Sequence, residues 1–240
     1  IVSHIVHGLW VHPDNNRHRF NDLDYWTELA QLLEYGTFDG VFLADVIGTY
    51  DRFRDGPETS LREGMQIPSN DPLLVIPAMA GVTKNLGFGA TFSTTYEPPF
   101  AFARRMSTLD HLTKGRVGWN IVTSYLESGA KNLGQKAQTE HDARYDYAEE
   151  YLEVCYKLWE GSWEEGAVLR DRERGSSATR ARSTRSATSA NTSRCPAFTC
   201  ANRRHNARRC CTRPGRRAVA NSSPPNRPNA CSLPHRRKCC

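Results

Sequence analysis

Apolar and polar positions repeat with two different periods along the first 165 residues. Three short apolar runs, at residues 38–44, 86–93 and 116–123, are typical of buried strands. Four longer segments carry apolar residues at helical spacing, at residues 22–36, 71–84, 100–112 and 141–163. Strands that alternate with helices build a parallel sheet, because a parallel return needs a crossover connection. The pattern therefore predicts an α/β fold whose sheet is open or closed into a barrel.

Two of the helical segments carry more specific signals. Asn21 or Asp22 is placed to cap the first helix, and Gly36 is placed to end it. In the last helix, at residues 141–163, Cys155 shares a face with large apolar side chains. We therefore expect Cys155 to be a core residue and not a nucleophile.

Hydroxyl, amide and carboxyl side chains stand where the predicted strands end. Asp45 follows the first strand, and Thr91 and Ser93 close the second. Asn120 and Ser124 stand at the end of the third. In α/β folds ligands bind at the carboxyl ends of the strands, so the chemistry is expected there. Taken alone, Asp45 favours a capping role over ligand binding or bonding to backbone amides.

Three further stretches are candidates for binding. His141 and Tyr145 lie four residues apart at a helix start, where backbone N–H groups favour an anion such as phosphate. A helix cap with a packed aromatic ring fits the same spacing. The polar loop at residues 46–71 is long for a compact domain, and such loops are often functional. The histidines within residues 1–20 lack a zinc spacing, which leaves a ligand-contacting loop or a polar surface loop.

Several functional classes lack their sequence signals. No GxGxxG follows a strand, and GxxxxGK[ST] and GxSxG are absent, so a Rossmann dinucleotide site, a P-loop and a hydrolase elbow are not indicated. No apolar run approaches the roughly 20 residues of a membrane span, and no signal peptide is visible. Only one cysteine, Cys155, precedes residue 176, which fits a reducing cytosol and predicts a cytoplasmic protein.

The charges divide the chain into two unlike parts. Residues 1–175 contain 17 Lys and Arg and all 26 Asp and Glu. Residues 176–240 contain the other 15 basic residues, no acid and seven of the eight cysteines. The net charge of +6 describes neither part. The sequence predicts a folded domain at residues 1–175 and a tail without a stable fold at residues 176–240.

Four stretches of the first part carry a resemblance that periodicity could not supply. They are HGLWVHPDNNRHRFNDLDYWTELAQLLEYGTFDGVFLADV, IPSNDPL, TFSTTYEPPFAFARRMSTLDHLTKGRVGWNIVTS and EHDARYDYAEEYLEVCYKLWEGSW. Together they resemble the flavin-dependent monooxygenases of the bacterial luciferase-like superfamily. The branch is that of nitrilotriacetate monooxygenase, dibenzothiophene-sulfone monooxygenase and pristinamycin synthase component A. Within this branch, the sequence looks most similar to long-chain alkane monooxygenase.

The resemblance implies a fold, a cofactor and partners. The family fold is a TIM-type (β/α)8 barrel, so residues 1–175 are expected to form its N-terminal half without the first strand. Family members use reduced FMN from a separate NAD(P)H:flavin reductase, and O2 adds to the flavin C4a carbon as a peroxide that oxygenates a small organic substrate. The resemblance implies an alkane-like substrate, with an aminopolycarboxylate or an aromatic sulfone as the alternative. It also implies a homo-oligomer without membrane or nucleic-acid partners.

The resemblance also implies roles for individual residues. The positions that match flavin contacts of the family, or lie near them, are Asp45, Thr91, Asn120, Ser124, His141 and Tyr145. The positions that match residues on the substrate side of the alkane enzyme are His4, Tyr50 and Gln66. At Tyr125 the alkane enzyme carries a histidine implicated in activity. Tyr125 is grouped with His4, Tyr50 and Gln66 as a candidate catalytic residue, and because of this departure the resemblance does not fix the identity of the substrate.

Three interpretations of residues 176–240 compete. The abundance of arginine without acids is typical of a disordered arm that binds nucleic acid, and the cysteines with His205 offer zinc ligands at irregular spacing. The third interpretation is a shifted reading frame. Codons can be chosen for residues 190–215 that, read one base out of register, encode GKYFKVPGLHLCEPSPQRTPVLYQAG, which has the character of the family. The length of this match favours the third interpretation, which predicts a truncated, inactive chain that binds FMN weakly and tends to aggregate.

Overall fold

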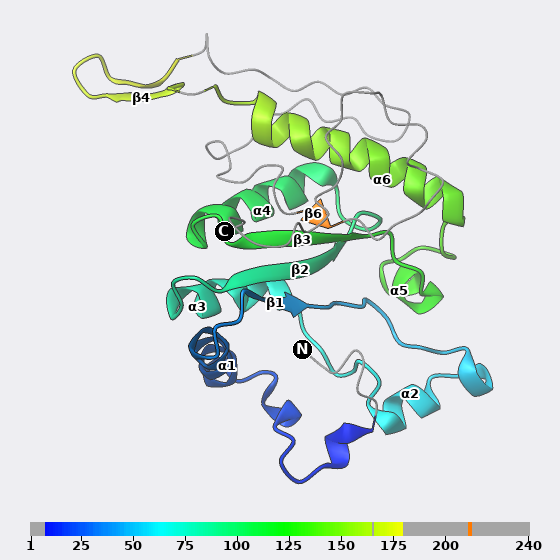
Figure 1. Cartoon of the computed structure of the whole chain (residues 1–240). Coiled ribbons are helices and arrows are strands. Elements are labelled where there is room, and N and C mark those ends of the chain that lie inside the picture. The colour runs from blue at the N-terminus through cyan, green and yellow to red at the C-terminus, as the bar shows by residue number, and fades with distance from the viewer. Residues whose placement is uncertain (1–7, 165, 180–210, 213–240) are drawn as a thin grey trace. The chain divides into compact units, whose positions relative to one another are not determined.

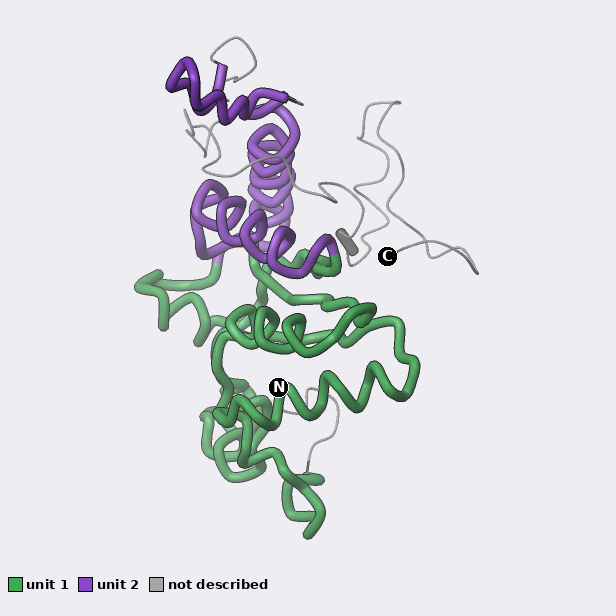
Figure 2. The backbone as a smooth tube through the Cα atoms, turned by 90° about the vertical axis from the view of Figure 1, so that its left-hand side faces the viewer, with its two compact units in different colours: residues 1–93, 116–138, 211–240 green, residues 94–115, 139–210 purple. Residues whose placement is uncertain are grey.

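The computed structural model describes residues 8–164, 166–179 and 211–212. The chain divides into two compact units, which Figure 2 shows in different colours. Unit 1 comprises residues 1–93, 116–138 and 211–240, and unit 2 comprises residues 94–115 and 139–210. Each unit therefore joins segments that are distant in the sequence.

Unit 1 is organised around a parallel sheet. Its described strands are β1 (Gly40–Leu43), β2 (Gly87–Ser93), β3 (Val117–Val122) and β6 (Cys211–Thr212). They lie in the order β1-β2-β3-β6, and every neighbouring pair is parallel (Figure 1). The three predicted apolar strands and the predicted parallel α/β fold are therefore confirmed. Phe88 in β2 is almost fully buried, which places the core of this unit around the central strands.

Helix α1 (Leu23–Tyr35) begins and ends where its capping residues predict. Asp22 is the N-cap, and its side chain accepts a hydrogen bond from a backbone amide of the first turn at 3.0 Å. Gly36 follows the last helical residue. Trp26 and Ala30 are the buried residues of the helix, and α1 contacts α3 (Ile76–Gly81).

The connection from β1 to β2 differs from the prediction. Its polar part, predicted as a loop, contains the short helices η3 (Phe53–Asp55) and α2 (Glu58–Glu63). The single helix predicted after it is instead a 3-10 turn, η4 (Pro72–Leu74), followed by the six-residue helix α3. Pro77 explains this division, because proline has no amide to donate and fits only the first turn of a helix. The prediction of one long helix here is therefore wrong.

Three other short helices complete unit 1. They are η1 (Leu9–Val11), η2 (Arg17–Arg19) and α5 (Glu127–Asn132). The last of them follows β3, in a segment to which the sequence pattern assigns no helix or strand. Its six residues are too few to show a helical period in the sequence.

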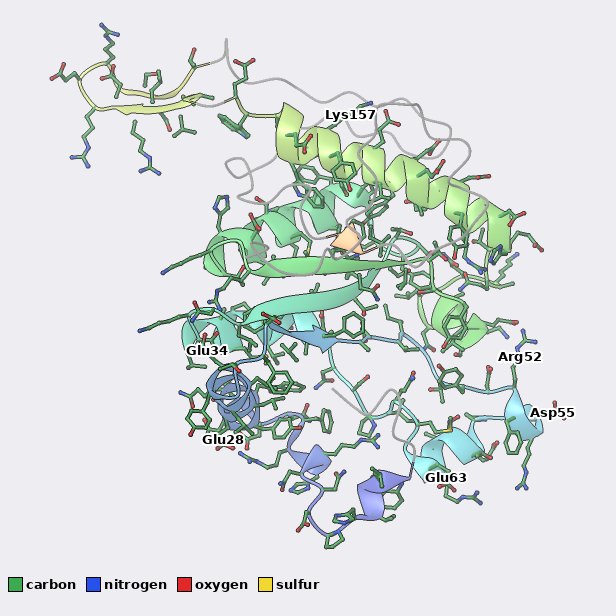
Figure 3. All side chains as sticks on the ribbon, in the orientation of Figure 1. Glu28, Glu34, Arg52, Asp55, Glu63 and Lys157 are labelled. Atoms are coloured by element: carbon green, nitrogen blue, oxygen red, sulfur yellow. The ribbon has the colours of Figure 1, made fainter. Side chains whose placement is uncertain are left out.

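Two charged side chains fix the amino ends of β2 and β3. The Glu34 carboxylate, labelled in Figure 3, accepts hydrogen bonds from the backbone amides of residues 84–86 at 2.5–3.2 Å. The Arg116 guanidinium donates at 2.8–3.1 Å to the backbone carbonyls of Ala80, Thr83 and Leu86. The amide bonds hold the pKa of Glu34 below its ordinary value. Burial lowers the pKa of Arg116, and the charge of Glu34 opposes this shift.

The described part of unit 2 contains two long helices, a π-helical turn and a hairpin. The helices are α4 (Pro99–Leu112) and α6 (His141–Tyr156), and the turn is η5 (Lys157–Gly161). The hairpin pairs β4 (Val168–Asp171) with β5 (Ser176–Ala178) in antiparallel orientation. Unit 2 therefore has no strand in the parallel sheet among its described residues.

Aromatic side chains form the core of unit 2. The ring of Phe102 lies 5.8 Å from that of Tyr151 and 6.4 Å from that of Trp159, measured between centroids. The Trp159 indole N–H donates to the carbonyl of Ala103 at 2.9 Å. Cys155 is fully buried among these helices, which confirms it as a core residue.

Most of the predicted tail lies outside the described residues. The parts that are described form strands, since β5 pairs with β4 and β6 pairs with β3. The prediction of a tail without a stable fold concerns mainly residues outside the described ranges and stays a prediction. The nucleic-acid, zinc and reading-frame interpretations rest mainly on residues outside the described part and stay predictions. Across the described ranges, none of the helices combines the length and apolar character that crossing a bilayer requires.

Candidate functional site

The side chains of Thr91 and Asn120 form a hydrogen-bonded pair across the sheet. The two residues are register partners on β2 and β3, and the Asn120 amide donates to the Thr91 hydroxyl at 3.1 Å. Thr91 is 5% exposed, so its hydroxyl is almost completely removed from water. The sequence predicts that each residue lies near the carboxyl end of its strand, and in the structure the two side chains are in contact.

A second pair lies further along the same two strands. The Ser124 hydroxyl donates to the Ser93 hydroxyl at 2.9 Å, two residues beyond the end of β3. Ser124 has a φ of 57°, in the left-handed region, which bends the chain as it leaves the strand. The predicted gathering of hydroxyl groups at these strand ends is therefore observed within unit 1.

Asp45 lies two residues after β1 and is half-buried. Burial, with a smaller contribution from the negative charge of Asp71, raises the pKa of its carboxyl to about 6. A hydrogen bond with the Val46 amide acts in the opposite direction. The next helix, η3, begins only at Phe53, so the capping role that the sequence alone favours is wrong. Asp71 is the residue that caps a helix here, because its side chain accepts from the Leu73 amide at 2.8 Å at the start of η4.

Two tyrosines from different loops meet in unit 1. Tyr50 follows β1 and Tyr125 follows β3, and their hydroxyl groups share a hydrogen bond. Their ring centroids lie 6.2 Å apart with an angle of 41° between the planes. Tyr50 is expected on the substrate side and Tyr125 is the position that departs from the alkane enzyme, and the structure places the two side chains next to each other.

Gln66 lies in the connection between β1 and β2 and is 6% exposed. Its backbone has a φ of 60°. Arg17 supports this turn from both sides, because its guanidinium donates to the carbonyls of Gly64 and Ile67. The remaining residue predicted on the substrate side, His4, lies outside the described residues.

His141 and Tyr145 lie at the start of α6 in unit 2. Their ring centroids are 5.1 Å apart, so the predicted meeting of the two side chains is observed. The His141 Nδ1 atom lies 2.8 Å from a carboxylate oxygen of Asp142. His141 is exposed, whereas Tyr145 is half-buried.

Sequence reasoning missed three residues that shape this region of unit 1. Asp71 acts on the titration of Asp45, and Ser60 and Ser128 bond the backbone beside Tyr50. A serine or aspartate has no pattern of its own, so only the folded contacts reveal these roles. The one signal in the sequence was the pair of small residues Ser128 and Gly129, which allows the backbone at Gly48 to approach closely.

The groups at the carboxyl ends of β1, β2 and β3 are mostly neutral donors and acceptors. Asp45 adds one carboxyl group of raised pKa. Throughout the part of the chain that the structure describes, no group of His, Cys, Asp and Glu could hold a metal ion. The arrangement is suited to orienting an organic ligand that carries N–H and C=O groups.

Comparison with known proteins agrees with this architecture. A model of the luciferase-like monooxygenase family matches residues 2–191. Long-chain alkane monooxygenase from Geobacillus thermodenitrificans is 67% identical over 172 residues, which cover 72% of this chain and 39% of that protein. Dimethyl-sulfide monooxygenase from Hyphomicrobium sulfonivorans is 56% identical over 174 residues, covering 72% and 36%.

The solved structures show the same likeness. A crystal structure of long-chain alkane monooxygenase matches with a TM-score of 0.86 and 56% identity, over 89% of this chain and 49% of that one. The chain thus spans less than half the length of these relatives. The predicted resemblance and the fold class, part of a TIM-type barrel, are confirmed. Because the family model covers most of the sequence and the fold agrees, the chain belongs to the luciferase-like monooxygenase family.

Proposed function

We propose that this chain supplies the flavin-holding and substrate-holding strands of an FMNH2- and O2-dependent monooxygenase. The observation that carries the proposal is the Thr91–Asn120 pair, which stands at the same end of the sheet as Asp45 in a chain of this family. A riboflavin lyase whose structure contains modified FMN supports a flavin ligand, with 39% identity and a TM-score of 0.79 over 86% of this chain and 46% of that one.

The residues fit the edge of a flavin ring, which presents both N–H and C=O groups. The Thr91 hydroxyl accepts a hydrogen bond from Asn120, so its own proton can be donated to a ligand. The Asn120 side-chain oxygen remains an acceptor. Asp45 adds a carboxyl group that is present in both protonation states near pH 6. Ser124 extends the row of hydroxyl groups.

In unit 2, His141 and Tyr145 are proposed as further flavin contacts. The proposal rests on their matching positions in the family and on the adjacency of their rings at 5.1 Å. They lie at the start of α6, a 16-residue helix whose first amides favour a negative charge. A phosphate group is the part of FMN that suits such a position.

The protein's part in the reaction is orientation and exclusion of water. When bound, reduced flavin supplies the two electrons with which one atom of O2 enters the substrate and the other leaves as water. Thr91 and Asn120 hold the ring edge, and the burial of the Thr91 side chain keeps water from this contact. His4, Tyr50, Gln66 and Tyr125 are proposed to line the substrate side. We propose an alkane-like organic substrate, a partner flavin reductase, a homo-oligomer and a cytoplasmic location.

A fusion protein tests the proposal. Residues 1–175 replace the corresponding segment of the full-length Geobacillus relative, and the fusion receives FMN, a flavin reductase, NADH, labelled 18O2 and n-hexadecane. We expect one 18O atom in the product, and no product from the 240-residue chain alone. A fusion that folds and yields no label, while the relative itself does, would refute the assignment. Dibenzothiophene sulfone and nitrilotriacetate in parallel reactions separate the alternative substrates of the branch.

A nucleic-acid-binding protein remains the alternative from another class. It depends on the arginine-rich residues 176–240. DNA binding that weakens steeply with salt and disappears when these residues are deleted would support it.

A further inference from the structure

The loop after β1 and the helix after β3 are joined by a reciprocal pair of hydrogen bonds. The Ser128 hydroxyl on α5 donates to the Thr49 carbonyl at 2.7 Å and accepts from the Thr49 amide at 3.0 Å. Two bonds to the backbone of one residue fix its orientation as well as its position. The loop is therefore held in register with α5, although the two segments are 79 residues apart.

The same junction requires a glycine. A Cβ atom on Gly48 would lie 2.7 Å from the Gly129 amide nitrogen and 2.7 Å from the Ser128 hydroxyl oxygen. Gly48 also has a φ of 128°, which side chains of L-residues rarely permit. The close packing at Gly48 and the hydrogen bonds between Ser128 and Thr49 act on consecutive residues. Together they fix the position of this short segment of the loop.

The residue that follows this segment is Tyr50. A third contact holds it, because the buried Ser60 hydroxyl on α2 donates to the Tyr50 carbonyl at 2.6 Å. Its backbone is therefore fixed from α2, and that of the preceding residue from α5. These backbone contacts place Tyr50 where its hydroxyl forms a hydrogen bond with the hydroxyl of Tyr125.

When two hydroxyl groups form a hydrogen bond with each other, only one of their two protons takes part in it. One hydroxyl donates and the other accepts, and the O–H of the acceptor stays available. Within the described residues neither hydroxyl has another hydrogen-bond partner. Tyr125 is 58% exposed, yet desolvation of its phenol and the contact with Tyr50 raise its pKa above the ordinary value of 10.0. Tyr125 therefore keeps its proton throughout the physiological pH range.

We propose that Tyr50 and Tyr125 form a single hydrogen-bond donor that selects substrates carrying an acceptor oxygen, and that Ser128 is the positioning residue that assembles it. The proposal rests on the proposed function and narrows its substrate class. The tyrosine rings contact an apolar chain, and the spare hydroxyl proton bonds a carbonyl, sulfoxide or sulfone oxygen on that chain. A plain alkane of equal length makes the same contacts with the tyrosine rings and lacks only this hydrogen bond.

The test compares two probes with equal carbon chains, 2-heptanone and n-heptane, against the full 240-residue chain. Dissociation constants are measured by ligand-observed NMR without flavin. Tyr125→Phe alone would leave the Tyr50 O–H as a donor, so the test variant carries Tyr50→Phe and Tyr125→Phe together. This variant is expected to weaken 2-heptanone about fivefold, because one hydrogen bond contributes about 1 kcal/mol, and to leave n-heptane unchanged. An equal change for both probes, no change for either, or no binding of either probe to the parent would overturn the proposal.

The role of Ser128 needs its own variants. Ser128→Ala is expected to weaken 2-heptanone as the paired Tyr50→Phe and Tyr125→Phe substitutions do, without altering n-heptane, and Ser128→Thr is expected to restore the affinity. Adding Ser128→Ala to the paired substitutions should cause no further loss, because all three changes act on one donor. Ser176→Ala is the matched control, since its hydroxyl bonds only the Ala178 carbonyl within β5. Ketone affinity that stays at the parent value in Ser128→Ala would overturn the positioning role.

FMN binding by the fusion that carries residues 1–175 is followed separately through flavin fluorescence. The probe experiment contains no flavin, so the two results are independent. If the paired Tyr50→Phe and Tyr125→Phe substitutions abolish ketone selectivity while the fusion does not bind FMN, the donor pair is supported and the proposed function is contradicted. If the fusion binds FMN and the paired substitutions leave ketone affinity unchanged, the proposed function is supported and the donor pair is contradicted.

Discussion

The side-chain amide of Asn120 donates to the hydroxyl of Thr91, its register partner on the neighbouring parallel strand, at 3.1 Å. Register partners on adjacent strands point to the same face of the sheet. The bond therefore sets the direction of both polar groups before a ligand arrives, so less conformational freedom is lost when the ligand binds. Such preorganisation is expected where a flat ring must be held in one orientation.

Arg116 is expected to be a main support of the sheet. Its guanidinium donates to three backbone carbonyls and to the Thr83 hydroxyl. Arg116→Ala is expected to lower the free energy of unfolding by about 2 kcal/mol, because these acceptors lose a charged donor. Urea denaturation measures the loss. Arg104→Ala, at an exposed position of α4, is the matched control. Equal losses in the two variants would contradict this role for Arg116.

Glu34 should make stability depend on pH at the acidic end. Its pKa is lowered from 4.5 by the backbone amides, first of all that of Asn85. A lowered pKa means that the stabilisation is present above the unfolded value and is lost as the pH falls through the folded one. Glu34→Gln is therefore expected to be less stable than the parent near pH 7 and equal to it near pH 2. Glu28→Gln, which removes only a surface ion pair with Arg19, is the control. A difference that persists at low pH would count against this mechanism.

Asp45 should act in the opposite sense. Its pKa is raised from 3.8 to about 6, so the folded chain binds this proton more tightly than the unfolded chain does. Stability is then highest below the unfolded value and falls as the pH rises through about 6. Asp45→Asn is expected to raise the free energy of unfolding by about 1 kcal/mol near pH 8, after allowance for partial solvent screening, and to change little near pH 4. Denaturation measured near pH 8 and near pH 4 tests this prediction. A gain in the free energy of unfolding that is equal at both pH values would contradict the titration of Asp45.

The strands and the long helices could be predicted from the sequence because the apolar residues of each element recur with a single period. The apolar run that becomes β2 and the caps Asp22 and Gly36 are local signals that the folded chain keeps. The division between η4 and α3 was missed because the helical spacing of apolar residues within residues 71–84 continues across Pro77. The helices α2 and α5 have six residues each, so contacts such as that of Ser128 with Thr49 decide them.

The candidate site was predicted only in part for the same reason. Strand ends can be located from the apolar pattern, so Thr91, Asn120 and Ser124 could be named together. The pairing of Tyr50 with Tyr125 joins residues 75 apart, and no local pattern reports it. The charge of Asp71 acts on Asp45 from the far end of a long connection, which also requires the folded chain.

The central claim is that the polar ends of β1, β2 and β3 hold a flavin. The most direct test is an FMN titration, by flavin fluorescence, of the fusion that carries residues 1–175 in the Geobacillus relative. Thr91→Val removes a buried hydroxyl from the ring edge, whereas Thr108→Val makes the same change on the exposed face of α4. We predict that Thr91→Val weakens FMN binding about tenfold, equivalent to about 1.4 kcal/mol, and that Thr108→Val leaves it unchanged. FMN affinity that is the same in Thr91→Val as in the parent would contradict the account.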